Sequence, residues 1–160
     1  MKKSLEERGY DNLDRVILEE LQANGRISVA DLARKIHLSQ PAVHNRIKRL
    51  ERDGIITNYV ALLDREQVGY DLLCFVQIRL SPHTEAVIRE VEDCVGHMTQ
   101  VLEMYATTGG TDMFLKIVVE NHHQLNDLVA EFTGLKGIER VETNLVLREI
   151  KVTTVLSLDE

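Results

Sequence analysis

Four polar side chains on one predicted helix have the chemistry needed to contact the edges of DNA bases. They are Gln40, His44, Asn45 and Lys48. The last three follow Gln40 by four, five and eight residues, so all four lie on one side of a helix over residues 39–53. The amide of Asn45 suits adenine, and the ammonium of Lys48 suits guanine. We therefore predict that this helix enters the major groove of double-stranded DNA.

The same helix carries further residues that suit DNA. Arg46, Arg49 and Arg52 are expected to hold phosphates, which would give an affinity that falls steeply with salt. Ser39 and Pro41 stand at its start, where such a helix comes nearest to the bases. The alternative is an ordinary antiparallel helix pair whose outer face is only solvated. The almost purely basic character of the face, with its amide and imidazole groups, favours DNA.

A helix-turn-helix must position this face, and the sequence carries its start and stop signals. Ser28 followed by Asp31 indicates the start of a first helix, and Ser39 is suited to cap the second. The second helix is expected to end at Gly54. With an amphipathic helix over residues 12–23, this makes a three-helix domain. Apolar residues on the far side of the second helix would anchor it on that domain: Val43, Ile47 and Leu50.

Charge is divided unevenly along the 160 residues, whose formal net charge is −7. Residues 1–54 hold 11 Lys and Arg against 9 Asp and Glu, a net of +2. Residues 55–160 hold 8 against 17, a net of −9. This asymmetry fits a DNA-reading domain joined to an acidic domain that the DNA does not touch.

The remaining bulk features lead us to expect a cytoplasmic protein without a membrane partner. Cys74 and Cys94 are too few for a disulfide framework. The N-terminus lacks the apolar core of a signal peptide, and the longest apolar runs are too short to span a membrane. Residues 1–11 are polar and are expected to fray.

The segment after the helices reads as a strand. Residues 55–64 are rich in β-branched and aromatic side chains, so they could form a wing beside the DNA or a linker strand between domains. We therefore expect a helix-turn-helix domain over residues 1–54, a strand linker or hinge over 55–69, and a second domain over 70–160.

The second domain alternates between strands and helices. Strands are expected over residues 72–80, 101–107 and 113–119, with closing strands over 138–150 and 151–156. One helix follows Ser81-Pro82 and another covers residues 124–132. The order β-α-β-β-α-β is ferredoxin-like, so the fold class of the whole chain is α+β. Because both helices would cover the same face of the sheet, the other face needs a partner, and a second copy of the chain is the simplest one.

A glycine-rich hairpin signal in this domain could bind a small molecule. Residues 107–112 read TTGGTD, and adjacent glycines leave backbone N–H groups open to a carboxylate. Asp112 could accept a hydrogen bond from an ammonium group, so a free amino acid would suit both ends. Taken alone, the pattern favours a plain hairpin turn in which Gly109 and Gly110 supply the turn and Asp112 caps it.

Several short motifs together resemble one family of regulators. The sequence is similar to the Lrp/AsnC (leucine-responsive/asparagine-regulator) family of bacterial and archaeal transcription factors. The resemblance rests on Arg26-Ile27-Ser28, Asp31-Leu32-Ala33, Leu38-Ser39, Val43, Arg46, Arg49-Leu50-Glu51 and Gly54-Ile55-Ile56. One departure is His37, where the family usually has Gly. A left-handed turn is therefore expected at His37, with slight strain, since His is among the residues enriched in that conformation.

The resemblance implies further properties. Residues 55–64 would be a linker strand that also helps to pair two subunits, and the dimers would assemble into octamers or related rings. The hairpin resembles the family's Gly-x-x-Asp motif, which lines an amino-acid effector site between dimers. That motif implies Gly109 and Asp112 as effector residues, and adjacency adds Thr108, Gly110 and Thr111. Part of the family binds no effector.

We expect no catalytic residue, no metal ligand and no cofactor. The histidines show no zinc-like spacing, and no nucleophile and base form a recognisable motif. The rival from another class is a tetrapyrrole-pathway decarboxylase of similar two-domain fold, in which His97 or His122 would act as acid or base. A basic recognition helix has no use in such an enzyme. Another alternative is an effector-independent, architectural DNA-binding protein.

Overall fold

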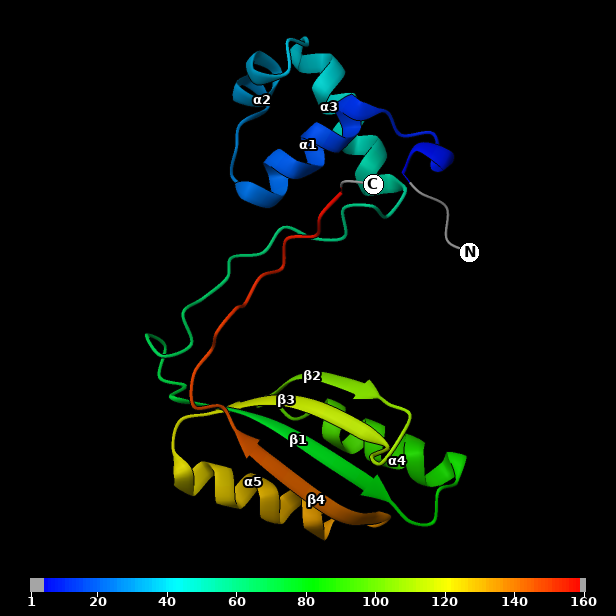
Figure 1. Cartoon of the computed structure of the whole chain (residues 1–160), viewed down its shortest axis with the longest axis vertical. Helices are drawn as coiled ribbons and strands as arrows, with labels where there is room; N and C mark the ends of the chain where they lie inside the picture. The colour runs from blue at the N-terminus through cyan, green and yellow to red at the C-terminus, as the bar shows by residue number, and fades with distance from the viewer. Residues whose placement is uncertain (1–4, 159–160) are drawn as a thin grey trace. The chain divides into compact units, whose positions relative to one another are not determined.

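The chain folds into two compact units, shown as a computed structural model that describes residues 5–158 (Figure 1). The first unit contains residues 5–62 together with 152–158, and the second contains residues 63–151. The structure thus divides the chain differently from the expected limits, because the end of the chain belongs with the helices. Within residues 5–158, no helix is both long and apolar enough to cross a membrane.

The first unit is the predicted three-helix domain. A short 3-10 helix, η1 (Glu6–Arg8), precedes α1 (Asn12–Ala23), α2 (Val29–Lys35) and α3 (Gln40–Arg52). Side chains from all three α-helices meet in one core that includes Ile17, Leu32, Ala33, Val43 and Leu50. Burial of this apolar face anchors α3, as the spacing predicted.

The turn signals of the helix-turn-helix are confirmed. The Ser28 hydroxyl accepts a hydrogen bond from the Asp31 N–H at 3.0 Å, and the Ser39 hydroxyl accepts one from the Ala42 N–H at 3.4 Å. His37 has a φ of 56°, the left-handed conformation expected for it. Gly54, with a φ of 71°, closes α3.

The expectation that residues 1–11 fray was wrong for the part that the structure describes, and residues 1–4 lie outside it. Tyr10 is buried against the helical core. Asp11 caps α1 in a reciprocal capping box, since its side chain accepts from the Asp14 N–H and the Asp14 side chain accepts from the Asp11 N–H. Polar residues here are fixed by hydrogen bonds that composition alone did not reveal.

Residues 55–64 form no strand, contrary to the prediction. The backbone groups of residues 57–64 find no backbone partner within residues 5–158, and a strand requires such a ladder. Their side chains are largely exposed, including Val60, Leu62 and Leu63. A β-rich composition therefore produces extended backbone here without a sheet inside the chain.

The second unit is the predicted ferredoxin-like fold. Its elements are β1 (Leu72–Leu80), α4 (Glu85–Gly96), β2 (Val101–Ala106), β3 (Met113–Val119), α5 (His122–Gly134) and β4 (Ile138–Leu145). The strands lie in the order β2-β3-β1-β4, and each neighbouring pair is antiparallel. Alternate residues of β1 and β3 pack with α4 and α5 in a single core, so both helices cover the same face of the sheet (Figure 1).

No helix of the second unit packs on the other face of the sheet. This uncovered face carries Phe75 of β1 and Phe114 of β3, whose rings stack with centroids 5.4 Å apart. In the register of β1 with β3, Gln77 is opposite Phe114 and Lys116 is opposite Phe75. Aromatic and polar side chains are therefore interleaved on this face.

The closing strands are shorter than predicted. β4 ends at Leu145, and residues 146–158 form no strand. The end of this segment is bound to α1 instead: the Gln22 side chain accepts from the Leu156 N–H at 2.7 Å and donates to the Leu156 carbonyl at 3.1 Å. Leu158 packs against the helical core. A polar helix side chain thus satisfies backbone groups that a strand partner was expected to satisfy.

Candidate functional site

The exposed side of α3 brings together the four side chains predicted to contact bases. Gln40, His44, Asn45 and Lys48 are all exposed. Within residues 5–158, none of these side chains has a hydrogen-bond or ion-pair partner. The side chains are therefore free to hydrogen-bond an external molecule without breaking an internal contact.

Two arginines of α3 that were predicted to hold phosphates make contacts within the chain. Arg46 donates to both carboxylate oxygens of Asp11 at 2.9 Å and to Asp14 at 2.7 Å. Arg49 donates to the other Asp14 oxygen at 2.6 Å. Asp14 is fully buried, so its charge needs these partners. Arg46 and Arg49 are occupied in fixing α3 against the start of α1.

Tyr10 reinforces this junction between α3 and the start of α1. The Arg49 guanidinium lies over the Tyr10 ring, 4.8 Å from its centroid, and the Tyr10 hydroxyl donates to Asp53 at 2.9 Å. Hydrogen bonds from Arg52 and from Tyr10 hold the pKa of Asp53 below its usual value. Tyr10 thereby ties the segment before α1 to the end of α3.

Hydrogen bonds at the junction between α3 and α1 also affect the pKa of Asp11. Desolvation alone would raise the pKa of Asp11. The hydrogen bonds that it accepts from Arg46 and from the Asp14 backbone outweigh this, and its pKa lies below the usual value. Sequence reasoning missed Asp11 and Asp14, although their spacing of three residues before an apolar run is a helix-start signal that could have identified them.

The other predicted residues of α3 have mixed roles. Arg52 is mostly exposed and pairs with its neighbour Asp53 at 2.9 Å. The Ser39 hydroxyl is used as the cap, and Pro41 sits in the first turn, where its missing N–H costs nothing. Basic side chains of α2 are paired, Arg34 with Asp31 and Lys35 with Glu20. Among described residues of α2 and α3, Lys48 is thus the basic side chain without an internal partner.

The predicted effector hairpin is present, and its acidic residue faces inward. The Asp112 carboxylate accepts from the Leu80 N–H at 2.7 Å and lies 3.2 Å from His83 Nε2. The Asp112 N–H donates to the Ile78 carbonyl at 3.0 Å, and its own carbonyl accepts from the Thr107 N–H at 2.9 Å. Asp112 therefore ties the hairpin to the end of β1, whereas the structural alternative considered from the sequence had it cap the turn.

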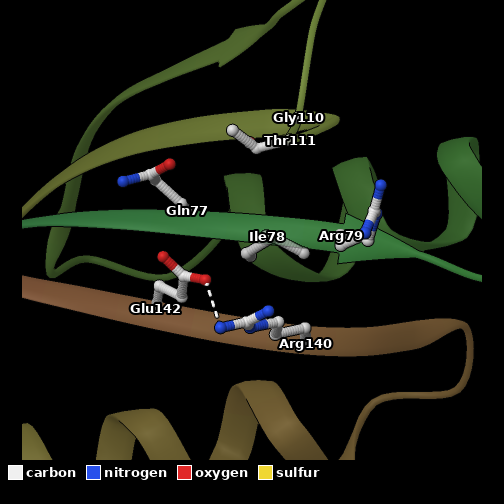
Figure 2. Close-up of a pocket in the computed structure, with 7 residues that line it drawn as sticks. All are labelled: Gln77, Ile78, Arg79, Gly110, Thr111, Arg140 and Glu142. Atoms are coloured by element: carbon white, nitrogen blue, oxygen red, sulfur yellow. Dashed lines mark ion pairs between the residues drawn. The ribbon is translucent and has the colours of Figure 1, made fainter.

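Beside the hairpin lies a shallow, solvent-open hollow (Figure 2). It is lined by Gln77, Ile78, Arg79, Gly110, Thr111, Arg140 and Glu142. Of the five predicted effector residues, Gly110 and Thr111 line the hollow, whereas Thr108, Gly109 and Asp112 do not. Gly109 supplies a left-handed turn with a φ of 121°. Sequence reasoning missed the charged side chains from β1 and β4, because only strand pairing brings them to the hairpin.

The histidines named as alternatives occupy surface positions. His97 is exposed, and its Nδ1 lies 2.6 Å from the Asp93 carbonyl of the preceding turn. His122 is also exposed, in the first turn of α5. Within residues 5–158, no group of three or more His, Cys, Asp or Glu side chains is placed to hold a metal ion.

Comparison with known families accounts for both units. Residues 10–57 match the family described as winged helix-turn-helix DNA-binding, and residues 73–156 match the Lrp/AsnC ligand binding domain. The chain is 32% identical to the HTH-type transcriptional regulator FL11 of Pyrococcus furiosus over 146 residues, which cover 91% of this chain and 95% of that protein. It is 34% identical to the leucine-responsive regulatory protein of Escherichia coli K12 over 145 residues, 90% of this chain and 88% of the relative.

Solved structures give the same assignment. A transcriptional regulator of Neisseria meningitidis in complex with L-methionine is similar with a TM-score of 0.90 and 30% identity, covering 94% of this chain and 97% of that one. The structure of Escherichia coli AsnC is similar with a TM-score of 0.84 and 31% identity, covering 91% and 97%. The likeness therefore extends over nearly the whole of each chain.

Proposed function

This chain belongs to the Lrp/AsnC family of DNA-binding transcriptional regulators, and we propose that it reads DNA with the exposed side of α3 and responds to an amino acid. The observation that carries the proposal is the set of exposed side chains on α3 that have no partner among residues 5–158. Gln40, His44, Asn45 and Lys48 present an amide, an imidazole, a second amide and an ammonium on one side of an anchored helix. These are the groups that hydrogen-bond base edges in the major groove.

Positioning and reading are separate tasks in this proposal. Arg46 and Arg49, fixed on Asp14, hold α3 at a set angle on α1. Asn45 and Lys48 then make the contacts that distinguish bases, and Arg52 reaches a phosphate from the end of the helix. Because Lys48 and Arg52 are the main cationic contacts from α3, the salt dependence contributed by this helix is modest.

The effector part of the proposal rests on the second unit. A related regulator from Neisseria meningitidis was solved in complex with L-methionine. The hairpin of residues 107–112 provides open backbone at Gly110, where a Cβ would meet nothing within 4 Å, so its N–H groups could meet the carboxylate of an amino acid. Binding of the amino acid would change the affinity for DNA only as far as the amino acid favours one state of the assembly over another.

We propose further that a second copy covers the uncovered face of the sheet. The stacked rings of Phe75 and Phe114 lie on that face. Extended segments on either side of the second unit expose further apolar side chains, among them Val60, Leu62, Leu147 and Val152. Burying such a surface against an identical copy gives a closed twofold dimer. Dimers would then join into a larger assembly, with an octamer as the expected form.

Two measurements test the proposed function. Fluorescence anisotropy with a labelled random-sequence DNA duplex should show binding that weakens as the salt concentration rises. The variant Asn45→Ala should discriminate less than the wild type among DNA sequences selected for tight binding. A thermal-shift screen of the twenty amino acids should identify at least one that raises the melting temperature. Absence of any DNA binding would refute the regulator assignment for α3, and absence of any stabilising amino acid would refute the effector part alone.

A further inference from the structure

His37 is a solvent-exposed residue in the turn between α2 and α3. Its neighbours on both sides, Ile36 and Leu38, pack against the helical core, whereas the His37 side chain is left at the surface. Among residues 5–158, the imidazole has no hydrogen-bond or ion-pair partner. No contact within the described part of the chain therefore accounts for a histidine at this position.

The backbone at His37 has a conformation that glycine adopts more readily than histidine. His37 follows Ile36, the residue that caps the end of α2, and has a φ of 56°. The Leu38 N–H donates to the Ala33 carbonyl at 3.0 Å, which is the hydrogen bond of a helix end whose next-to-last residue is left-handed. Any side chain at that residue destabilises the turn relative to glycine. Because the imidazole adds strain and no internal contact, its contribution has to be sought outside the folded chain.

The position of His37 in the helix-turn-helix brings it to the DNA backbone. In such a motif the first helix crosses the sugar-phosphate backbone, and the second enters the major groove with its N-terminal residues nearest to the bases. His37 lies at the passage from the first helix to the second, three residues before Gln40, where α3 begins. The DNA groups that flank the groove at this passage are phosphates, which accept most of the hydrogen bonds that position a protein on a duplex.

The charges around this turn favour an anion. The first turn of α3 has no acidic residue. At the end of α2, Arg34 is paired with Asp31 and Lys35 with Glu20, so the carboxylates of these pairs are compensated. An imidazole has an N–H donor in either protonation state and carries a positive charge when it is protonated. His37 can therefore donate to a phosphate oxygen without first losing an internal partner.

We propose that His37 donates a hydrogen bond to a DNA phosphate at the edge of the major groove. Such a contact is independent of base sequence, so it adds affinity for every duplex, unlike the base contacts assigned to Asn45 and Lys48. Protonation of the imidazole turns the contact into an ion pair, so the affinity for DNA rises as the pH falls. The inference rests on the proposed docking of α3 in the major groove.

The test is fluorescence anisotropy of the full-length protein with two labelled duplexes of equal length, one of random sequence and one selected for tight binding. Each is titrated in a salt series at about pH 6 and about pH 8, because an imidazole gains its charge over this range. His37→Gly removes the imidazole and suits the left-handed backbone, and His37→Asp puts a negative charge at the same place. His122→Asn, a change of an exposed histidine on α5, is the matched control.

We expect His37→Gly to weaken binding of both duplexes by about threefold to tenfold, although its urea midpoint should equal or exceed that of the wild type. The loss should be larger at the lower pH, where the slope of log affinity against log salt should also become shallower by about 0.9. His37→Asp should weaken binding further by repulsion, and His122→Asn should bind as the wild type does. Any pH dependence left in His37→Gly belongs to His44, the other exposed imidazole of this surface.

Three results would overturn the inference and keep the proposed function. One is equal affinity of His37→Gly and the wild type for both duplexes at both pH values. Another is a loss confined to the selected duplex, which would make His37 a base contact. The third is a loss that is the same at both pH values and comes with a lower urea midpoint, which would give the histidine a structural role. If the wild type bound neither duplex, the proposed docking of α3 would fail together with this inference.

Discussion

Replacing Asp14 with Asn should destabilise the helical unit strongly. The carboxylate is fully buried and accepts hydrogen bonds from Arg46 at 2.7 Å, Arg49 at 2.6 Å and the Asp11 N–H at 3.1 Å. An amide keeps the size of the side chain but removes its charge, so two guanidinium groups lose their shared anion. Removing one partner of a buried ion pair costs about 3–5 kcal/mol. At a typical slope of about 2 kcal/mol per molar urea, the unfolding midpoint would fall by about 2 M.

Urea unfolding followed by circular dichroism at 222 nm is the appropriate assay, because the chain has no tryptophan for fluorescence. Glu19→Gln is the matched control, since it is the same acid-to-amide class of change on the same helix. Glu19 is exposed and lies 3.8 Å from Arg15, so we expect a loss of at most about 0.5 kcal/mol.

The network that Asp14 shares with Arg46 and Arg49 also predicts that substitutions within it have non-additive effects on stability. Arg46→Gln should cost less in an Asp14→Asn background than in the wild type, because the two residues share one network. An Asp14→Asn midpoint within about 0.3 M of the wild type, or full additivity of the two changes, would refute the assignment of Arg46 and Arg49 to the junction.

Three further changes test other contacts. The pKa values of Asp11 and Asp53 are lower in the folded protein than in the unfolded chain, where they are about 4, so both carboxylates stabilise the fold above that pH. This stability should be lost as the pH falls through the folded pKa values. The urea midpoint should therefore drop between pH 5 and pH 3, and the drop should be smaller in Asp11→Asn. Gly137→Ala should lower the melting temperature markedly, because Gly137 has a φ of 89° and a Cβ there would overlap Val87 Cγ1. Gly110→Ala should leave it unchanged, since a Cβ there would meet nothing within 4 Å. Gln22→Ala should release the segment at Leu156, seen as faster cleavage of the C-terminal residues by a protease, while Gln124→Ala, on α5, should leave that rate unchanged.

Local patterns accounted for much of the fold. Caps such as Ser28 and Ser39 form because the hydroxyl, the backbone donor and the chain between them lie within four residues. The left-handed conformation of His37 was expected from the family resemblance, in which Gly is usual at this position. The helices and strands of the second unit followed from hydrophobic periodicity, which reports the buried face of each element.

Features that depend on distant residues could not be read in the same way. Arg46 was predicted to hold a phosphate because it is a basic residue of the recognition helix, and its contact with Asp14, 32 residues earlier, could not be read from local pattern. Arg79 and Arg140 meet only through the register of β1 with β4. Residues 55–64 have strand composition, yet a strand also needs a partner, and composition does not contain one.

The most direct test of the central claim is the salt dependence of DNA binding by Lys48→Gln. Binding of a labelled DNA duplex would be measured by anisotropy across a salt series for this variant, the wild type and Arg34→Gln as a control outside α3. If Lys48 enters the groove from the exposed side of α3, its loss should weaken binding about tenfold or more, with part of the effect in the salt slope, and the control should match the wild type. Equal affinity and slope for Lys48→Gln and the wild type would contradict the account.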